Sequence, residues 1–249
     1  MDRLPGTASP EPGGESFKTT HWSVVLSSGN ASENVARQAL EHLCRTYWPP
    51  LYAYVRRQGH SPEDAQDLTQ GFFERFIERG YFALADPERG RFRTFLLTSL
   101  QRFMVEEWRK TSRQKRGGGQ VLMTLPTTGA EEAYAAALHD DLSPDRLYDR
   151  RWAEVLLNRV MVCLAEDYAS SGRAAMYKEL QRSLWGGRAE VSYAELGAQL
   201  GMTEGAIKVA VHRLRHRFRD LLREEVADTV RTPEQVEEEM QHLLAAFTP

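Results

Sequence analysis

A segment near the C-terminal end, Val191–Leu222, constrains the fold of this chain more than any other. Ser192 and Glu195 have the spacing of a capping box, which satisfies free backbone donors at the start of a helix. Gly201 supplies the permissive backbone that a tight turn needs, and Thr203 is positioned to cap a second helix. The pattern therefore predicts two helices joined by a short turn.

The second helix of this segment is amphipathic and basic. Its apolar residues recur at steps of three and four, as one buried face requires: Ile207, Val211, Leu214, Phe218 and Leu221. Lysine, arginine and histidine occupy its other faces: Lys208, His212, Arg213, Arg215, Arg217 and Arg219. Such a helix can bury one side and offer the other to the phosphates of a nucleic-acid groove. The alternative is a solvated amphipathic helix in an ordinary bundle.

Charge in this chain is local rather than global. The formal net charge is −3 and the sequence pI is about 6.2, which argues against a protein that coats DNA without specificity. Basic residues gather at 102–116 and 208–219, whereas acids gather at 131–145 and 224–239. That segregation is typical of a protein that touches DNA at two places while it binds a larger partner.

Helical spacing also extends over residues 32–112. Pro49-Pro50 interrupts this pattern and is expected to kink the helix or restart it. Ser61-Pro62 is a strong helix start, and a further helix is expected over residues 93–111. Because no convincing strand and no repeat occurs, the sequence predicts an all-α fold.

Aromatic and basic residues are interleaved between Arg89 and Lys110. Aromatic rings among cations suit single-stranded DNA, because bases stack on the rings while the cations meet phosphates. For Phe95 and Phe103, a place in the core of a small domain is an equally good interpretation.

Other functional classes find little support. Cys44 and Cys163 lie far apart among apolar residues, which favours two buried thiols in a reducing cytoplasm over a metal or redox site. Residues 1–16 are typical of a disordered leader, and no segment has the apolar core of a signal peptide or the length of a membrane span. The chain lacks a Walker loop, a HExxH motif, a zinc spacing and a glycine-rich nucleotide fingerprint. We therefore expect a cytoplasmic protein with no enzymatic activity, no cofactor and no membrane insertion.

Three motifs in order resemble those of bacterial RNA polymerase sigma factors: Asp64–Phe73 (DAQDLTQGFF), Arg91–Phe103 (RFRTFLLTSLQRF) and Ile207–Arg217 (IKVAVHRLRHR). They are similar in particular to the compact extracytoplasmic-function group, and the resemblance covers residues 36–224. It implies two small helical domains joined by a flexible linker. The second domain would contain a helix-turn-helix of the winged-helix-like DNA-binding class.

The resemblance implies the following division of the chain: residues 1–31, a disordered leader with a short packing segment; 32–112, a region-two-like domain; 113–144, an acidic linker; 145–225, a region-four-like domain; and 226–249, an acidic helical tail. The linker resembles the segment that passes through the RNA path of the polymerase. Three roles stay open for the tail: packing on the second domain, a regulatory contact, or a shield over the basic helix until polymerase binds.

Roles for single residues also follow from the resemblance. The polymerase-docking positions are Asp64, Asp67, Leu68, Gln70 and Phe73. The positions for the minus-ten DNA element are Arg89, Arg91, Phe92, Arg93, Phe95, Arg102, Glu107 and Lys110. The positions for the minus-thirty-five element are Thr203, Lys208, Val209, His212, Arg213, Arg215 and Arg217. Of the last group, Arg215 and Arg217 are better placed for phosphate than for base edges.

The implied partners are the clamp and flap regions of core RNA polymerase and promoter DNA, with an anti-sigma factor as a further candidate. The protein would be associated with the nucleoid when it is bound to polymerase.

The chain departs from the family pattern at a few positions. Phe95 stands in place of the usual tryptophan, Phe103 where asparagine is frequent, and Glu107 where aspartate is frequent, so the minus-ten preference is open. Ala210 replaces a frequent arginine. The rival hypothesis is a free-standing helix-turn-helix regulator that binds an operator as a dimer, which would leave the motifs of the first half unused.

Overall fold

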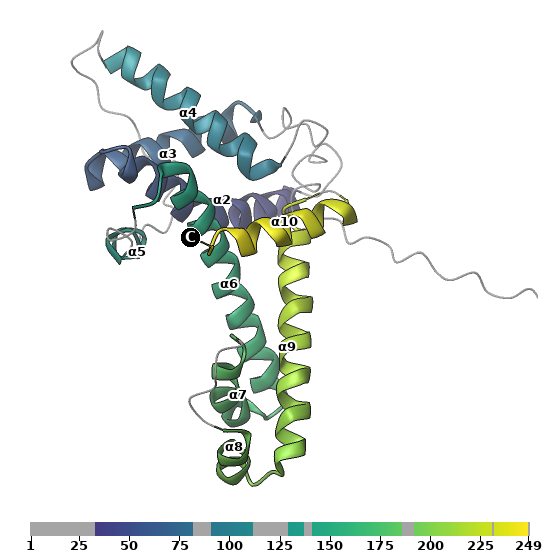
Figure 1. Ribbon diagram of the computed structural model, residues 1–249. Coiled ribbons are helices and arrows are strands. Elements are labelled where there is room, and N and C mark those ends of the chain that lie inside the picture. The colour runs from purple at the N-terminus through teal and green to yellow at the C-terminus, as the bar shows by residue number, and fades with distance from the viewer. Residues whose placement is uncertain are drawn as a thin grey trace, which may run out of the picture.

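The described part of the chain is built from helices (Figure 1). The computed structural model describes residues 33–81, 91–111, 129–136, 141–185, 192–230 and 232–248, and these ranges contain no strand. The predicted all-α class is therefore confirmed. The expected leader, residues 1–31, lies outside the described residues, as do Arg89 and most of the expected linker.

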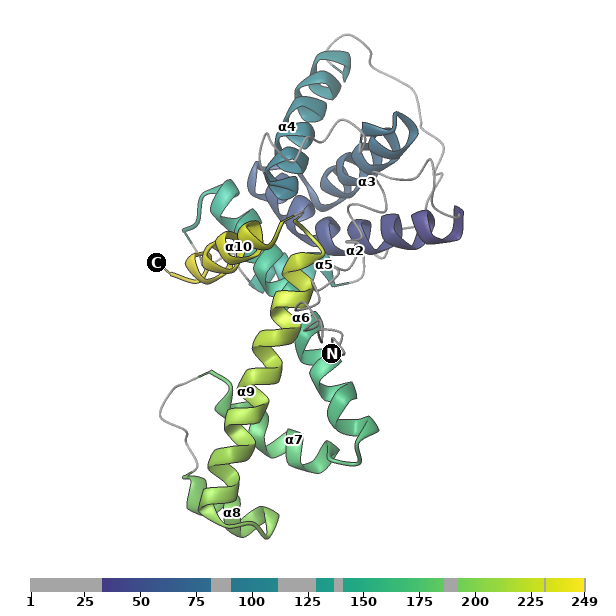
Figure 2. The same ribbon diagram turned by 90° about the vertical axis from the view of Figure 1, so that its right-hand side faces the viewer.

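The helices form a head and a stalk (Figures 1 and 2). In chain order they are α2 (Glu33–Arg57), α3 (Pro62–Glu78), α4 (Phe92–Thr111), α5 (Ala130–Ala136), α6 (Pro144–Ser170), α7 (Ala174–Leu180) with the 3-10 turn η3 (Gln181–Ser183), α8 (Tyr193–Leu200), α9 (Glu204–Ala227) and α10 (Pro233–Ala245). Helices α2 to α5 and α10 gather in the head. Helices α6 and α9 run side by side as the stalk, and α7 and α8 close its far end.

Aromatic side chains of α2 organise the core of the head. Trp48 stacks on Phe73 of α3 with ring centroids 5.8 Å apart, and Tyr47 meets Phe92 of α4 edge-on at 5.3 Å. All four rings are at most 4 % exposed. One face of α2 therefore fixes both α3 and α4.

Of the two expectations at Pro49-Pro50, a kink or a restart, the restart is wrong, because α2 continues through both prolines as one helix. Each proline removes one backbone donor from the helix. On either side of them Trp48 and Leu51 are almost completely buried, so packing against the core favours a continuous helix.

Helix α6 connects the head to the stalk. Tyr148 and Trp152 are buried toward its start, and Leu164 is buried toward its end. The same helix packs extensively on α2 and then along α9. One continuous helix thus contributes to the packing of both parts.

The short helix α5 falls within the range expected to be a linker. Its Glu131 accepts hydrogen bonds from Tyr52 (2.5 Å) and from Arg56 (2.8 and 2.9 Å), both on α2. Hydrogen bonding to Arg56 is the largest influence on Glu131 and, with that from Tyr52, lowers the pKa of its carboxyl although partial burial opposes the shift. This network holds α5 on the head. The division into two separate domains stays a prediction.

The caps predicted for α8 and α9 are present. Ser192 and Glu195 form a capping box, and Thr203 accepts a hydrogen bond from the backbone N–H of Ala206 (3.2 Å). Gly201 adopts φ +66°, in the left-handed region that favours glycine. Gly197 lacks a side chain for a different reason than Gly201: a Cβ at Gly197 would lie 2.6 Å from the carbonyl oxygen of Met202.

We predict that Gly197→Ala destabilises the protein, because the new methyl group would push against the backbone of the α8–α9 turn. The free energy of unfolding, measured by urea titration with circular dichroism, should fall by roughly 1–3 kcal/mol. Gly205→Ala is the matched control, since a Cβ at Gly205 meets nothing within 4 Å. The control should be neutral or stabilising by up to about 1 kcal/mol. Equal effects of the two substitutions would contradict the close approach.

Candidate nucleic-acid and partner interfaces

A groove between α3 and α4 combines acidic and apolar side chains. It is lined by His60, Asp64, Asp67, Leu68, Gly71, Phe103, Met104, Val105, Glu107 and Trp108. Trp108 is 71 % exposed and Val105 is 49 % exposed, which is unusual for apolar side chains of this size. An apolar surface with an acidic rim suits a partner that has an apolar face flanked by basic groups.

The predicted docking residues divide between this groove and the core. Asp64, Asp67 and Leu68 line the groove. Gln70 is half-buried on the same helix and donates a hydrogen bond to Glu74 (3.0 Å). Phe73 is 2 % exposed and stacks on Trp48, so its ring lies inside the head.

A cavity of about 300 Å³ with aromatic walls also lies between α3 and α4, and it shares Phe103 with the groove. Its lining residues are Phe72, Arg75, Phe76, Tyr81, Phe95, Ser99, Arg102, Phe103 and Glu106. Phe95 packs against Phe76 at 5.8 Å between ring centroids, and Phe103 packs against Phe72 at 5.9 Å. Phe95 and Phe103 therefore belong to the packing of the head and at the same time face a cavity.

An ion pair closes one edge of this cavity. Arg75 hydrogen-bonds to Glu106 and lies over the ring of Phe103, with the guanidinium carbon 5.7 Å from its centroid. The hydrogen bond from Arg75 is the main reason that the pKa of the Glu106 carboxyl is lowered. Arg102 is exposed at the same edge. The cavity thus offers rings for stacking and cations for phosphate.

The beginning of α4 is covered by other parts of the chain. Phe92 is 4 % exposed and packs on Tyr47. Arg93 is 6 % exposed, and its guanidinium pairs with Glu239 of α10 and Asp149 of α6. Burial opposes the charge of Arg93, yet these two carboxylates keep its pKa above the ordinary value. Arg93 was predicted to meet DNA, but in this arrangement its charge is neutralised inside the protein.

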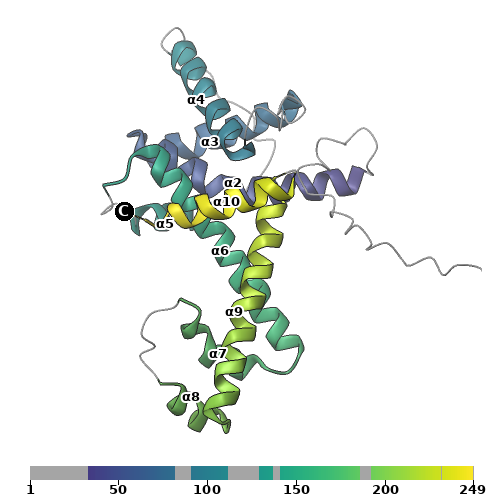
Figure 3. The ribbon, with the colours of Figure 1, turned by 45° about the vertical axis from the view of Figure 1, so that its right-hand side comes forward.

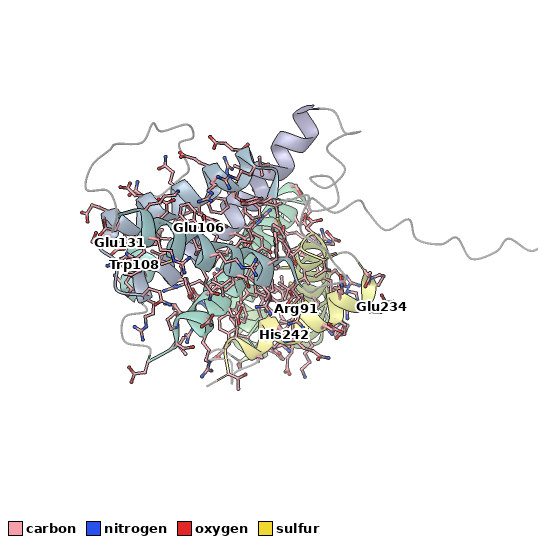
Figure 4. The ribbon with its side chains drawn as sticks, turned by 90° about the horizontal axis from the view of Figure 1, so that it is seen from above. Arg91, Glu106, Trp108, Glu131, Glu234 and His242 are labelled. Atoms are coloured by element: carbon pink, nitrogen blue, oxygen red, sulfur yellow. The ribbon has the colours of Figure 1, made fainter. Side chains whose placement is uncertain are left out.

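The C-terminal end of α4 is exposed to solvent. Lys110 is exposed and pairs with Glu107 at 2.6 Å. Figure 4 shows the two ends of the head: Trp108 and Glu106 lie on one side, whereas Arg91 lies beside α10, close to His242.

The start of α9 presents the exposed basic face that the sequence predicted. Lys208, Val209, His212 and Arg213 are all exposed, and Lys208 pairs with Glu204 one turn away at 2.8 Å. Arg219, which is not among the predicted DNA-contacting residues, is also exposed. This face lies at the far end of the stalk from α3 and α4 (Figure 2).

Two arginines of the same helix have structural partners. Arg215 donates two hydrogen bonds to the backbone carbonyl of Ser183, at 2.6 and 2.9 Å, and so holds η3 against α9. Arg217 pairs with Asp167 of α6 at 2.7 Å. Both were predicted to contact phosphate, and both here connect elements of the stalk.

The described residues contain no group of three or more side chains that could hold a metal ion. Cys163 is only partly buried, so the expectation of two buried thiols holds for Cys44 alone. Cys44 is buried, and burial, assisted by the charge of Glu41, raises the pKa of its thiol to about 12. That thiol is therefore protonated at neutral pH. Among the described helices, none is long and apolar enough to cross a membrane.

Comparison with known proteins gives one family match. Residues 43–114 match the family model of sigma-70 region 2. The match supports a sigma-70 family sigma factor. It covers most of α2, all of α3 and α4, and with them the groove and the cavity. No curated protein and no solved structure gives a significant match.

A sigma-70 region 2 domain supports a role in transcription initiation and in DNA binding. The second half of the chain lies outside the matched residues, so its function rests on the geometry of α8 and α9 and on the sequence resemblance.

Several residues that shape these surfaces were not predicted. Trp108 lies in the segment of interleaved aromatic and basic residues between Arg89 and Lys110, but nothing in that pattern distinguishes it from the other aromatic residues. Its ring is the most exposed large apolar group in the groove. Arg75 and Gly197 had no signal in the sequence pattern. Glu239 looked like one acid in an acidic tail, because its partner Arg93 is 146 residues away in the chain.

We predict that Arg213→Ala and Arg215→Ala separate DNA binding from stability. Arg213→Ala should weaken binding to duplex DNA and reduce the slope of log K against log salt by about 0.9, the loss of one phosphate contact. Its free energy of unfolding should not change. Arg215→Ala should lower the free energy of unfolding by about 1.5 kcal/mol or more, because two hydrogen bonds from a charged group are lost.

Fluorescence anisotropy with labelled duplex DNA and urea unfolding measure the two effects. A loss of stability on Arg213→Ala equal to that on Arg215→Ala would show that both residues are structural.

Proposed function

We propose that this protein is a sigma factor of the extracytoplasmic-function type, which binds core RNA polymerase, recognises a two-part promoter and helps to melt it. The observation that carries the proposal is the region 2 match over the same helices that form the groove and the aromatic cavity. The protein would work in the cytoplasm and at the nucleoid when bound to polymerase.

The groove between α3 and α4 is the proposed docking site for the polymerase clamp. Asp64 and Asp67 are exposed along it and offer carboxylates to basic groups of the partner. Leu68 and the exposed ring of Trp108 add apolar area that a docked partner would bury. Phe73 contributes from the core, where it fixes α3 against α2 through Trp48.

The aromatic cavity between α3 and α4 is the proposed site for an unstacked base of the minus-ten element. Taking a base out of the stack costs a few kcal/mol, and stacking on an aromatic ring returns about 1–3 kcal/mol per base. Phe95 and Phe103 supply rings at the cavity wall, and Arg102 supplies a cation for the adjacent phosphate. Lys110 and Glu107 lie further along the same helix, where they would meet the upstream part of the element.

The exposed basic face at the start of α9 is proposed to read the minus-thirty-five element. Lys208, Val209, His212 and Arg213 face solvent there, while Thr203 caps the helix and fixes where it begins. With 24 residues, α9 is about 36 Å long. That length separates this face from α4, as recognition of two spaced elements requires. The flap of the polymerase is the proposed partner of this half of the chain.

Neither DNA surface needs to bind tightly alone. Two weak binding surfaces on one protein act together, because binding by the first raises the effective concentration of the second. Docking on polymerase adds a third contact, which explains how a chain with a net charge of −3 can work on DNA.

We predict that Asp67→Ala weakens the complex with sigma-free core polymerase, because the substitution removes a carboxylate from the groove. The control is Glu78→Ala, which changes the same charge at an exposed position of the same helix that does not line the groove. The complex is measured by gel filtration and by titration of labelled protein with polymerase. Loss of binding with Asp67→Ala and retention with Glu78→Ala would support the proposal.

Two results would contradict the proposal. In one, the folded wild-type protein forms no complex with the polymerase. In the other, it binds an operator duplex tightly without polymerase, as a free-standing regulator does.

A further inference from the structure

The C-terminal helix α10 lies across the head, next to the beginning of α4 and the upper end of α9 (Figure 3). It belongs to the acidic tail, which lies outside the residues matched by the region 2 family model. Its position does not fit a shield over the exposed face of α9, because that face is at the opposite end of the stalk (Figure 2).

Two acids of α10 engage two arginines at the start of α4. Both carboxylate oxygens of Glu239 lie 3.1 Å from Nε of Arg93, and one of them lies 3.6 Å from Nε of Arg91. Glu238 lies 3.7 Å from Arg91. Glu239 is only 2 % exposed, so these arginines take the place of water as partners of its carboxylate.

Carboxylates and phosphates compete for the same arginine geometry. A guanidinium binds either of them through paired, charge-assisted hydrogen bonds. Arg91 and Arg93 lie at the N-terminal end of α4. Phe95, about one turn further along the same helix, lines the proposed base-binding cavity. If a strand of DNA binds at this cavity, as the proposed function requires, its neighbouring phosphates would compete with Glu238 and Glu239 for these arginines.

Helix α10 is attached in a way that permits release. Its buried apolar contacts are made by Val236 and Leu243, whereas Leu244 is 63 % exposed and Phe247 is 41 % exposed. Met240 and Ala246 are partly buried against the core, and the guanidinium carbon of Arg150 lies 6.0 Å from the ring centroid of Phe247. Polar attachments are also present: Arg223 pairs with Glu237, and Arg146 donates to the carbonyl of Thr248 at 2.8 Å. Terminal helices with few buried contacts open at lower cost than the core.

We propose that α10 is an autoinhibitory helix whose Glu238 and Glu239 occupy Arg91 and Arg93 in place of DNA phosphates. The proposal rests on the proposed function of α4 in binding the minus-ten strand. In the closed state α10 neutralises Arg91, and together with Asp149 of α6 it neutralises Arg93. In the open state α10 leaves, and Arg91 and Arg93 bind the phosphates of single-stranded DNA.

The test uses the full chain and a fluorescein-labelled pool of random single-stranded 15-mers in a salt titration. Glu239→Gln removes the central charge while it keeps the shape of the side chain. It should tighten binding several-fold and steepen the slope of log K against log salt by about 0.7 for each arginine released. Glu166→Gln is the matched control, since it makes the same charge change at an exposed position of the stalk and should leave both quantities at the wild-type value.

Two further variants test the mechanism. Addition of Arg91→Gln to Glu239→Gln should reverse part of the gain in affinity for single-stranded DNA. It should also reduce the salt slope by about 0.7 relative to Glu239→Gln alone. A chain that ends at Val230 and lacks α10 should behave like Glu239→Gln, with its folding checked by circular dichroism.

Hydrogen exchange on the unaltered protein tests the same point without any substitution. Saturation with the 15-mer pool should increase exchange of the amides of α10 and leave α2 protected. Unchanged exchange in α10, or wild-type affinity and salt slope in both Glu239→Gln and the shortened chain, would overturn the autoinhibitory role. Binding of the wild-type protein to core polymerase is a separate measurement, so a sigma factor without autoinhibition is distinguishable from a protein that is no sigma factor.

Discussion

The burial of α6 against two different helices is the interaction on which the rest of the arrangement depends. Toward its start, Tyr148 and Trp152 are buried in the head, and Tyr148 donates a hydrogen bond to the backbone carbonyl of Arg93 at 2.9 Å. Toward its end, Leu164 is buried and Asp167 pairs with Arg217 of α9. Because one helix packs in both places, it holds α4 and the basic face of α9 at opposite ends of one molecule. The proposed recognition of two spaced DNA elements on one polymerase requires such an arrangement.

Local features of the fold were predictable from the sequence, because a cap or a tight turn depends on residues that are close in the chain. The caps at Ser61, Ser192 and Thr203 and the left-handed Gly201 are confirmed. The all-α class follows from the same local patterns. The continuous course of α2 through its two prolines was not predictable, since it depends on burial against helices that are distant in the chain.

Helical spacing in the sequence predicts which side chains of the candidate sites are exposed, but it does not predict their partners. Asp67 and Arg213 are exposed, as the patterns indicated. Arg215 and Arg217 occupy similar positions in the pattern, yet their guanidinium groups bind Ser183 and Asp167, and no local signal identifies those partners. The pairing of Arg93 with Glu239 links the start of α4 to the tail, so a residue predicted to meet DNA becomes part of a contact within the protein. Such long-range pairs decide which cations are available to a nucleic acid.

If this chain directs RNA polymerase to two-part promoters, selection of DNA from a random library should reveal both elements. Core polymerase would be incubated with the protein and a library of random duplexes, and the retained DNA would be sequenced. We expect two short conserved blocks at a fixed spacing, which appear only when both the protein and the polymerase are present. A palindromic site enriched by the protein without polymerase would contradict this expectation, as would the absence of any block that depends on the protein.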